Sequence, residues 1–128
     1  MFWRPKDPLL KQCEAVNARV NREIRPMTDL AQYGRADVWV SRPATRRGDC
    51  DDYCLTKADD LLDLGVDGGQ IAMWMVWTWR NECHAVLTVG DYVLDNLTSS
   101  VKVRAKRTDL RWEWPIWSPG EPYPRAKQ

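Results

Sequence analysis

The spacing of the apolar residues changes halfway along this chain of 128 residues, and that change limits the folds open to it. Over residues 8–24 the apolar side chains recur every three to four positions, which is typical of one face of a helix. Residues 50–64 repeat that pattern. The later runs are typical of strands and cover 71–79, 83–89, 92–95 and 101–107. Two N-terminal helices packed on an antiparallel β-sheet, an α+β fold, are therefore predicted.

Capping signals support both helices. Asp7 followed by Pro8 is typical of an N-cap and a first helical residue, and Pro26 stops the same helix. Asp49 is the expected N-cap of the second helix, which Gly65 ends. The chain has the size of one domain, so residues 1–128 are expected to form a single domain with a proline-rich, flexible tail over about 118–128.

Charge and hydropathy exclude some classes of protein. Lys and Arg number 19 against 18 Asp and Glu, which argues against a dedicated nucleic-acid binder. The longest apolar run, 71–79, is too short to span a membrane. The N-terminus has no apolar segment typical of a signal peptide, so we expect a cytoplasmic location in the producing cell. The sequence gives no indication of oligomeric state.

Cys50 opens the second helix, where free backbone N–H groups and the helix dipole favour a thiolate and can hold an oxyanion. The sole histidine, His84, and Asp95 lie on two strands joined at a tight turn, Gly90-Asp91. This register pairs positions whose numbers sum to 181, so His84 and Asp95 share a face as diagonal neighbours. A nucleophile, a base and an orienting carboxylate are thus one interpretation. The other interpretation is purely structural: a buried cysteine, a half-buried histidine and a capping aspartate.

The cysteines allow further interpretations. Cys13, Cys50, Cys54 and Cys83 would suffice for two disulfides, but Cys13 and Cys54 lie on the inward faces of the helices, where reduced cysteine acts as a small apolar residue. A zinc site made of Cys50, Cys54, Cys83 and His84 is a rival hypothesis. Adjacent strand residues point to opposite faces, so Cys83 and His84 are poorly placed to share an ion.

Three carboxylates surround Cys50, namely Asp49, Asp51 and Asp52. Alone they would raise the pKa of the thiol. Hard oxygen ligands at this density suit Ca²⁺, which would cancel the penalty. Capping of the helix N-terminus by acidic residues explains the same pattern without a metal.

Two blocks carry a family resemblance. GDCDDYCLTKADDLLDLG (48–65), followed by HAVLTVGDYVLDNL (84–97), resembles the bacterial transglutaminase-like cysteine proteinases. VNARVNREI (16–24) and YGRADVW (33–39) are similar to the segments that precede the nucleophile helix in that family. The resemblance covers roughly residues 10–110.

The resemblance implies a papain-like or transglutaminase-like fold with a Cys-His-Asp triad, matched here by Cys50, His84 and Asp95. Trp39 matches a family tryptophan at the oxyanion or substrate site. Some members are calcium-dependent periplasmic proteases, and their calcium ligands match Asp49, Asp51 and Asp52, although Asp51 replaces a longer Glu. Without their export signal, this compact chain resembles phage-encoded relatives, which implies association with a virion as an alternative location.

The expected function is hydrolysis of a peptide or isopeptide amide through an acyl-enzyme, with a protein or peptide as substrate. No cofactor is required for that chemistry, and Ca²⁺ is a candidate ion. Alternatives are a transglutaminase, a hydrolase of peptidoglycan peptides, and a non-catalytic binding or assembly module that retains the fold, such as a phage structural protein whose tryptophans form the contact surface.

Overall fold

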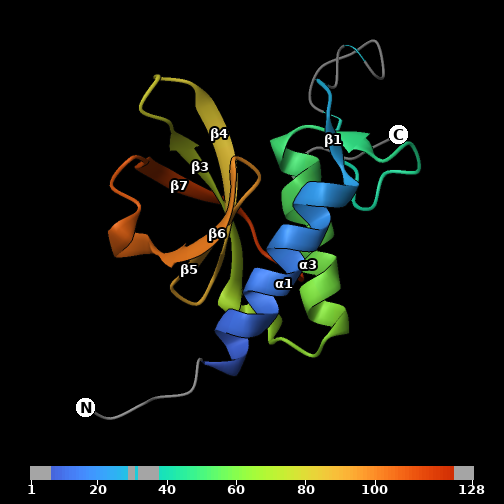
Figure 1. Cartoon of the computed structure of the whole chain (residues 1–128), viewed down its shortest axis with the longest axis vertical. Helices are drawn as coiled ribbons and strands as arrows, with labels where there is room; N and C mark the ends of the chain where they lie inside the picture. The colour runs from blue at the N-terminus through green and yellow to red at the C-terminus, as the bar shows by residue number, and fades with distance from the viewer. Residues whose placement is uncertain (1–6, 29–30, 32–37, 123–128) are drawn as a thin grey trace.

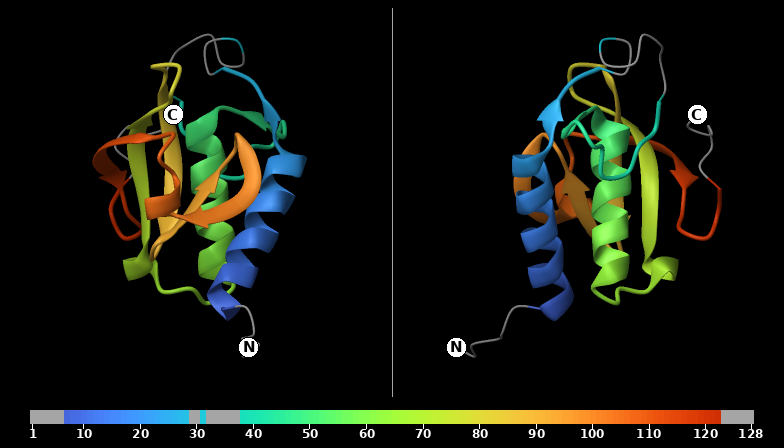
Figure 2. Two further views of the ribbon diagram at one scale, coloured as in Figure 1. Left: turned by 60° about the vertical axis from the view of Figure 1, so that its left-hand side comes forward. Right: turned by 90° about the vertical axis from the view of Figure 1, so that its right-hand side faces the viewer.

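The computed structural model describes residues 7–28, 31 and 38–122. Helices α1 (Pro8–Glu23) and α3 (Cys50–Asp63) lie side by side, run in opposite directions and cover one face of a five-stranded sheet (Figures 1 and 2). The predicted α+β fold is confirmed. The predicted block 33–39 is described only at its last two residues, and residues 123–128 of the predicted tail lie outside the described part.

The sheet has the strand order β6-β5-β4-β3-β7, and every neighbouring pair is antiparallel. Its strands are β3 (Ile71–Trp77), β4 (Cys83–Val89), β5 (Tyr92–Asp95), β6 (Thr98–Val103) and β7 (Arg111–Trp117). Two short 3₁₀ turns, Gly68–Gln70 and Arg104–Lys106, precede β3 and follow β6. The tight connections from β4 to β6 explain why consecutive strands are neighbours.

A second, two-stranded sheet joins the ends of the helices. β1 (Arg25–Pro26) follows α1, and β2 (Arg47–Gly48) precedes α3; the two pair in parallel. The Met27 N–H donates to the Gly48 carbonyl at 2.7 Å. This pairing fixes the chain immediately before Cys50.

Three strand predictions need correction. β3 ends at Trp77 rather than residue 79, because residues 78–81 already form the turn towards β4. β6 begins at Thr98 rather than residue 101, and residues 104–106 turn away as a 3₁₀ helix. β7 was not predicted as a strand, because Pro115 interrupts a segment whose alternating tryptophans are otherwise compatible with one. Proline cannot donate to a ladder, but it is tolerated on an edge strand, and β7 occupies the sheet edge beside β3.

The main core lies between the two helices and the sheet. It includes Val16 and Val20 of α1, Leu55 and Leu61 of α3, and Leu87 of β4. The opposite face of the sheet carries a smaller core of Val76, Val86, Val93 and Leu110. Burying apolar surface on both faces of β3 and β4 gives a rigid support for residues near the strand ends.

The helix termini agree with the predicted caps. The Asp7 side chain accepts from the Leu9 N–H at 3.1 Å, and Gly65 adopts a φ of 90°, the left-handed conformation of a helix stop. In the predicted tail, the Trp117 indole N–H donates to the Glu121 carbonyl at 2.9 Å, so the first tail residues fold back on the sheet edge. No helix of the described residues has the length and apolarity needed to cross a membrane.

Candidate active site

Cys50 is the first residue of α3, and a capping box holds the start of this helix. The Asp49 N–H donates to Asp52 Oδ2 at 3.2 Å, which satisfies a backbone group at the helix entry. Gly48, which precedes the N-cap Asp49, must be glycine for a steric reason. A Cβ atom at Gly48 would lie 2.7 Å from both Cβ and Oδ2 of Asp52. The helix N-terminus and its nucleophile candidate are therefore held in one position.

Asp52 also anchors the segment that precedes the site. Its other oxygen, Oδ1, accepts from the Val40 N–H at 2.7 Å. Farther along the same helix, Thr56 Oγ1 accepts from the Arg42 N–H at 2.8 Å. These bonds hold residues 38–42 along α3 and place the buried Trp39 in a pocket with Cys50. The sequence did not indicate this role of Asp52.

The hairpin that carries the other two candidates has the predicted register. Leu87 pairs with Leu94 and Val89 with Tyr92, so paired numbers sum to 181. His84 and Asp95 lie just beyond the Leu87–Leu94 pair on the same face, and His84 Nε2 lies 2.7 Å from Asp95 Oδ1. Both side chains are buried. The hairpin therefore brings the imidazole and the carboxylate into direct contact.

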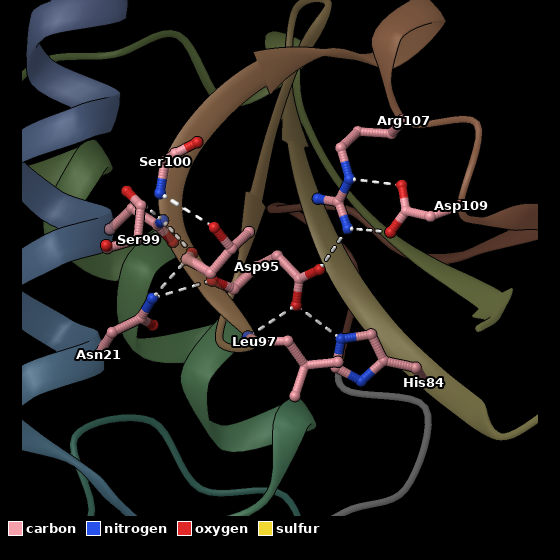
Figure 3. A network of polar contacts seen from close by, with 10 residues as sticks. Asn21, His84, Asp95, Leu97, Ser99, Ser100, Arg107 and Asp109 are labelled. Carbon is pink, nitrogen blue, oxygen red and sulfur yellow. Dashed lines mark hydrogen bonds and ion pairs between the residues drawn. The ribbon is translucent and has the colours of Figure 1, made fainter. Parts of the chain in front are cut away.

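Asp95 is held from three directions (Figure 3). Oδ1 also accepts from the Leu97 N–H at 3.0 Å, and Oδ2 accepts from Arg107 Nη2 at 2.8 Å. Burial alone would raise the pKa of this carboxyl, but the bonds from His84, Leu97 and Arg107 hold it well below its usual range. Asp95 is thus a fixed anion that orients the ring and leaves the other nitrogen, Nδ1, for other partners.

Arg107 is a functional candidate that the sequence did not reveal. It follows the 3₁₀ turn after β6, is buried, and also donates to both oxygens of Asp109 at 2.9 Å. Arg107 sits twelve residues from Asp95, in a stretch predicted to be a plain strand. A basic residue there has no distinguishing local signal.

Cys50 and His84 line one pocket of about 580 Å³. The Cys50 sulfur accepts a hydrogen bond from the backbone of Ala85, the residue after the histidine. Burial raises the pKa of the thiol, and the neighbouring Asp51 raises it further, whereas the Ala85 bond lowers it. The thiol therefore needs a base to accept its proton, and His84 lines the same pocket.

The three acidic residues at the start of α3 have the oxygen chemistry of a calcium site. As placed, however, both oxygens of Asp52 accept from backbone N–H groups, and Asp51 borders the pocket. Among the described residues no three His, Cys, Asp or Glu side chains gather to hold a metal. The donor chemistry fits calcium, and a complete ligand set would require the carboxylates to rearrange.

The competing interpretations of the cysteines do not hold. Cys83 is exposed at the start of β4, while His84 is buried behind it, so the two do not converge on an ion as the zinc hypothesis required. All four cysteines belong to the described residues, and none forms a disulfide. Cys13 and Cys54 pack in the main core instead.

Comparison with known proteins gives consistent results. The family profile described as bacterial transglutaminase-like cysteine proteinase BTLCP matches residues 3–114. Calcium-bound LapG from Legionella pneumophila is similar, with a TM-score of 0.72, 28% identity, and coverage of 88% of this chain and 66% of LapG. A second LapG structure gives the same values. EGTA-treated LapG gives a TM-score of 0.71, 28% identity, and coverage of 88% of this chain and 64% of LapG.

The chain spans slightly less than two thirds of the length of these LapG structures. No curated protein gives a significant match. The family profile covers most of the chain, including Cys50 and His84 and every other residue of their pocket except Pro115 and Ile116. This chain therefore belongs to the bacterial transglutaminase-like cysteine proteinases.

Proposed function

We propose that this protein is a thiol hydrolase that cleaves peptide or isopeptide amide bonds, with Cys50 as nucleophile, His84 as base and Asp95 as the residue that orients the ring. The observation that carries the proposal is the 2.7 Å contact between His84 and Asp95, beside the pocket that His84 shares with Cys50. Family membership supports it, because the family consists of cysteine proteinases.

The chemical steps use these three residues. His84 Nδ1 accepts the thiol proton while the Cys50 sulfur forms a bond to the substrate carbonyl carbon. The amide C–N bond then breaks, and the imidazolium returns the proton to the leaving amine. His84 next takes a proton from water, which attacks the thioester, releases the acid and restores the thiol. Asp95 remains an anion and stabilises the charged imidazolium.

The start of α3 supplies the second contribution. The Cys50 N–H at the start of this helix would donate to the oxyanion formed at the carbonyl, and one such donor is worth about 3–4 kcal/mol in comparable sites. Trp39 borders the same pocket and would form its wall beside the reacting carbonyl. Its anchored backbone keeps that wall in place.

Calcium is the second component of the proposal. Asp49, Asp51 and Asp52 are the residues that would hold it, and the calcium-bound structure of LapG supports the idea. A bound cation would offset the negative charge next to Cys50. The reaction steps above do not pass through the ion.

The direct test compares wild type with Cys50→Ala on a mixed-sequence peptide library, read by mass spectrometry. We expect Cys50→Ala to abolish cleavage with an unchanged Tm. Cys83→Ser is the matched control, because Cys83 borders the same pocket and should be dispensable. Cleavage by Cys50→Ala at the wild-type rate would overturn the proposal.

Two further measurements distinguish the alternative functions. Peptidoglycan peptides in the library test that substrate class, and an added primary amine reveals transamidation by a new product mass. Alkylation by iodoacetamide tests the base: His84→Ala should slow the reaction of Cys50 but not that of the exposed Cys83. Equal, slow alkylation of both cysteines in wild type, with no cleavage, would favour a non-catalytic binding module.

A further inference from the structure

Two pockets meet at His84. The first, described above, contains Cys50 and has apolar walls that include Met75, Trp114 and Ile116. The second, of about 720 Å³, also has His84 in its wall but not Cys50. His84 and Cys83 border both pockets. An extended chain that passes over Cys50 can therefore continue past the ring into the second pocket.

The second pocket carries an excess of positive charge. Four basic residues border it, namely Arg80, Lys102, Lys106 and Arg107, against two acidic residues, Glu82 and Asp109. Asp109 already forms an ion pair with Arg107, which donates to both of its oxygens. No ion pair within the described residues uses Lys102 or Lys106, and both are exposed. These two lysines are available to a ligand from solvent.

Exposed apolar side chains gather at the same two pockets. Among the described residues, four large hydrophobic side chains are strongly exposed, and three of them border these pockets. Trp79 and Leu97 border the basic pocket, and Trp114 borders the pocket that contains Cys50. Trp79 is 74% exposed and Arg80 lies over its ring at 4.9 Å. Such side chains beside a catalytic candidate are typical of a surface that a ligand covers.

The proposed mechanism gives the two pockets a direction. The histidine must protonate the leaving amine, so the leaving segment of the substrate lies next to the imidazole. The acyl segment stays attached to the Cys50 sulfur and occupies the apolar pocket. The basic pocket beyond His84 therefore receives the leaving segment.

We infer that this protein selects protein segments with an apolar side chain on the acyl side of the cleaved bond and acidic residues on the leaving side. The inference rests on the proposed function. Lys102 and Lys106 contact the acidic residues, Trp79 and Leu97 contact neighbouring apolar groups, and the charges also speed association with an acidic segment.

The test uses two peptide series with a constant apolar acyl side and either Glu or Lys at the first three leaving positions. Wild type and the charge-reversed double variant Lys102→Glu/Lys106→Glu are compared by kcat/KM. We expect wild type to prefer the Glu series roughly 3- to 10-fold, and the double variant to lose or invert that preference. High salt should reduce the wild-type preference. Lys11→Glu, an exposed lysine of α1 away from both pockets, is the control.

A separate binding readout distinguishes this inference from the proposed function. Fluorescence anisotropy of the same labelled peptides with Cys50→Ala measures affinity without cleavage. Tighter binding of the Glu series that the double variant loses supports the acidic preference, even if wild type cleaves nothing and the hydrolase proposal fails. Efficient cleavage with equal kcat/KM for both series would overturn the preference and leave the hydrolase proposal standing.

Discussion

Arg107 Nη2 donates to Asp95 Oδ2 at 2.8 Å, on the carboxylate oxygen opposite to the one that contacts His84 (Figure 3). The carboxylate is thus clamped between a guanidinium and an imidazole, and its plane cannot turn without breaking one contact. Because Arg107 also holds Asp109, its own side chain is fixed. Arg107 is therefore a positioning residue that acts on the reaction through Asp95.

Arg107→Gln should lower kcat/KM by about 10- to 100-fold, because a buried hydrogen bond to a charged group is worth roughly 1.5–3 kcal/mol. The pKa of Asp95 should rise when the guanidinium is removed. The acidic limb of the pH profile of kcat/KM should therefore move to higher pH. Arg107→Lys, which keeps the charge, should restore part of that shift.

The pH profile separates positioning from simple loss of stability. Arg22→Gln, at an exposed position on α1, is the control and should leave both the rate and the profile unchanged. If Arg107→Gln lowers only Tm and keeps the wild-type pH profile, the residue supports the fold and not the orientation of the ring.

The sequence predicted those features that local patterns determine. The register of one hairpin follows from a two-residue turn, so the contact between His84 and Asp95 could be anticipated. The cap at Asp49 could be predicted from residue type and position alone. Family resemblance, rather than geometry, related Trp39 to the site.

Features that depend on long-range contacts were not predictable. Arg107 reaches Asp95 only because the chain turns away from β6 four residues before the predicted end of that strand. The Trp-rich segment forms β7 along the edge of β3, a position that tolerates Pro115 although this residue has no N–H to donate. Asp52 accepts from both the Asp49 N–H and the Val40 N–H, and the second bond likewise depends on where the segment before α3 packs against the helix.

Asp95→Asn should change how stability depends on pH. The pKa of Asp95 is depressed in the folded protein, so its ionised form contributes stability above its ordinary pKa of 3.8, and that contribution is lost as the pH falls below this value. The free energy of unfolding of wild type should therefore exceed that of Asp95→Asn at pH 6 by on the order of 2 kcal/mol. The gap should narrow steadily towards pH 2.

Urea unfolding at several pH values measures this difference, with Asp91→Asn in the exposed hairpin turn as the control. A gap between wild type and Asp95→Asn that stays constant from pH 6 to pH 2 would contradict a depressed pKa. In that case the hydrogen bonds of Asp95 would be equally strong in its neutral form.

Calcium binding at the start of α3 can be tested by thermal unfolding. If Asp49, Asp51 and Asp52 hold the ion, millimolar Ca²⁺ should raise Tm relative to EGTA, because a ligand bound only by the folded state stabilises it. Asp51→Asn should remove that difference. It is a better test than Asp52→Asn, which would weaken the bonds to the Val40 and Asp49 N–H groups whether or not calcium binds.

Asp91→Asn again serves as the control and should keep the full response to calcium. Equal Tm values in Ca²⁺ and EGTA for the wild type would end the calcium proposal for this chain. Such a result would leave the acidic residues with the capping role already visible at Asp49 and Asp52.

Lys57 is a buried ammonium behind the candidate site, and its replacement should stabilise the protein. Its side chain is fully buried, its Nζ has no hydrogen-bond partner among the described residues, and it lies 5.5 Å from the centre of the Tyr53 ring. Burial lowers the pKa of Lys57 from 10.5 to about 8. The charged form is thus disfavoured in the folded state, which costs on the order of 1–3 kcal/mol below pH 8.

Lys57→Met keeps the length of the side chain and removes the charge, so it should raise the free energy of unfolding at pH 7. Between pH 8 and 10.5 the unfolded wild-type chain holds a proton that the folded protein has released, and wild-type stability therefore rises with pH in this window. The advantage of Lys57→Met should shrink over the same window. Urea unfolding at pH 7, 8.5 and 10 measures it, with Lys11→Met as the exposed control. A less stable Lys57→Met at every pH would mean that the ammonium makes a favourable buried interaction. A double-mutant cycle with Asp95, whose charge favours the ammonium, would then test that pair.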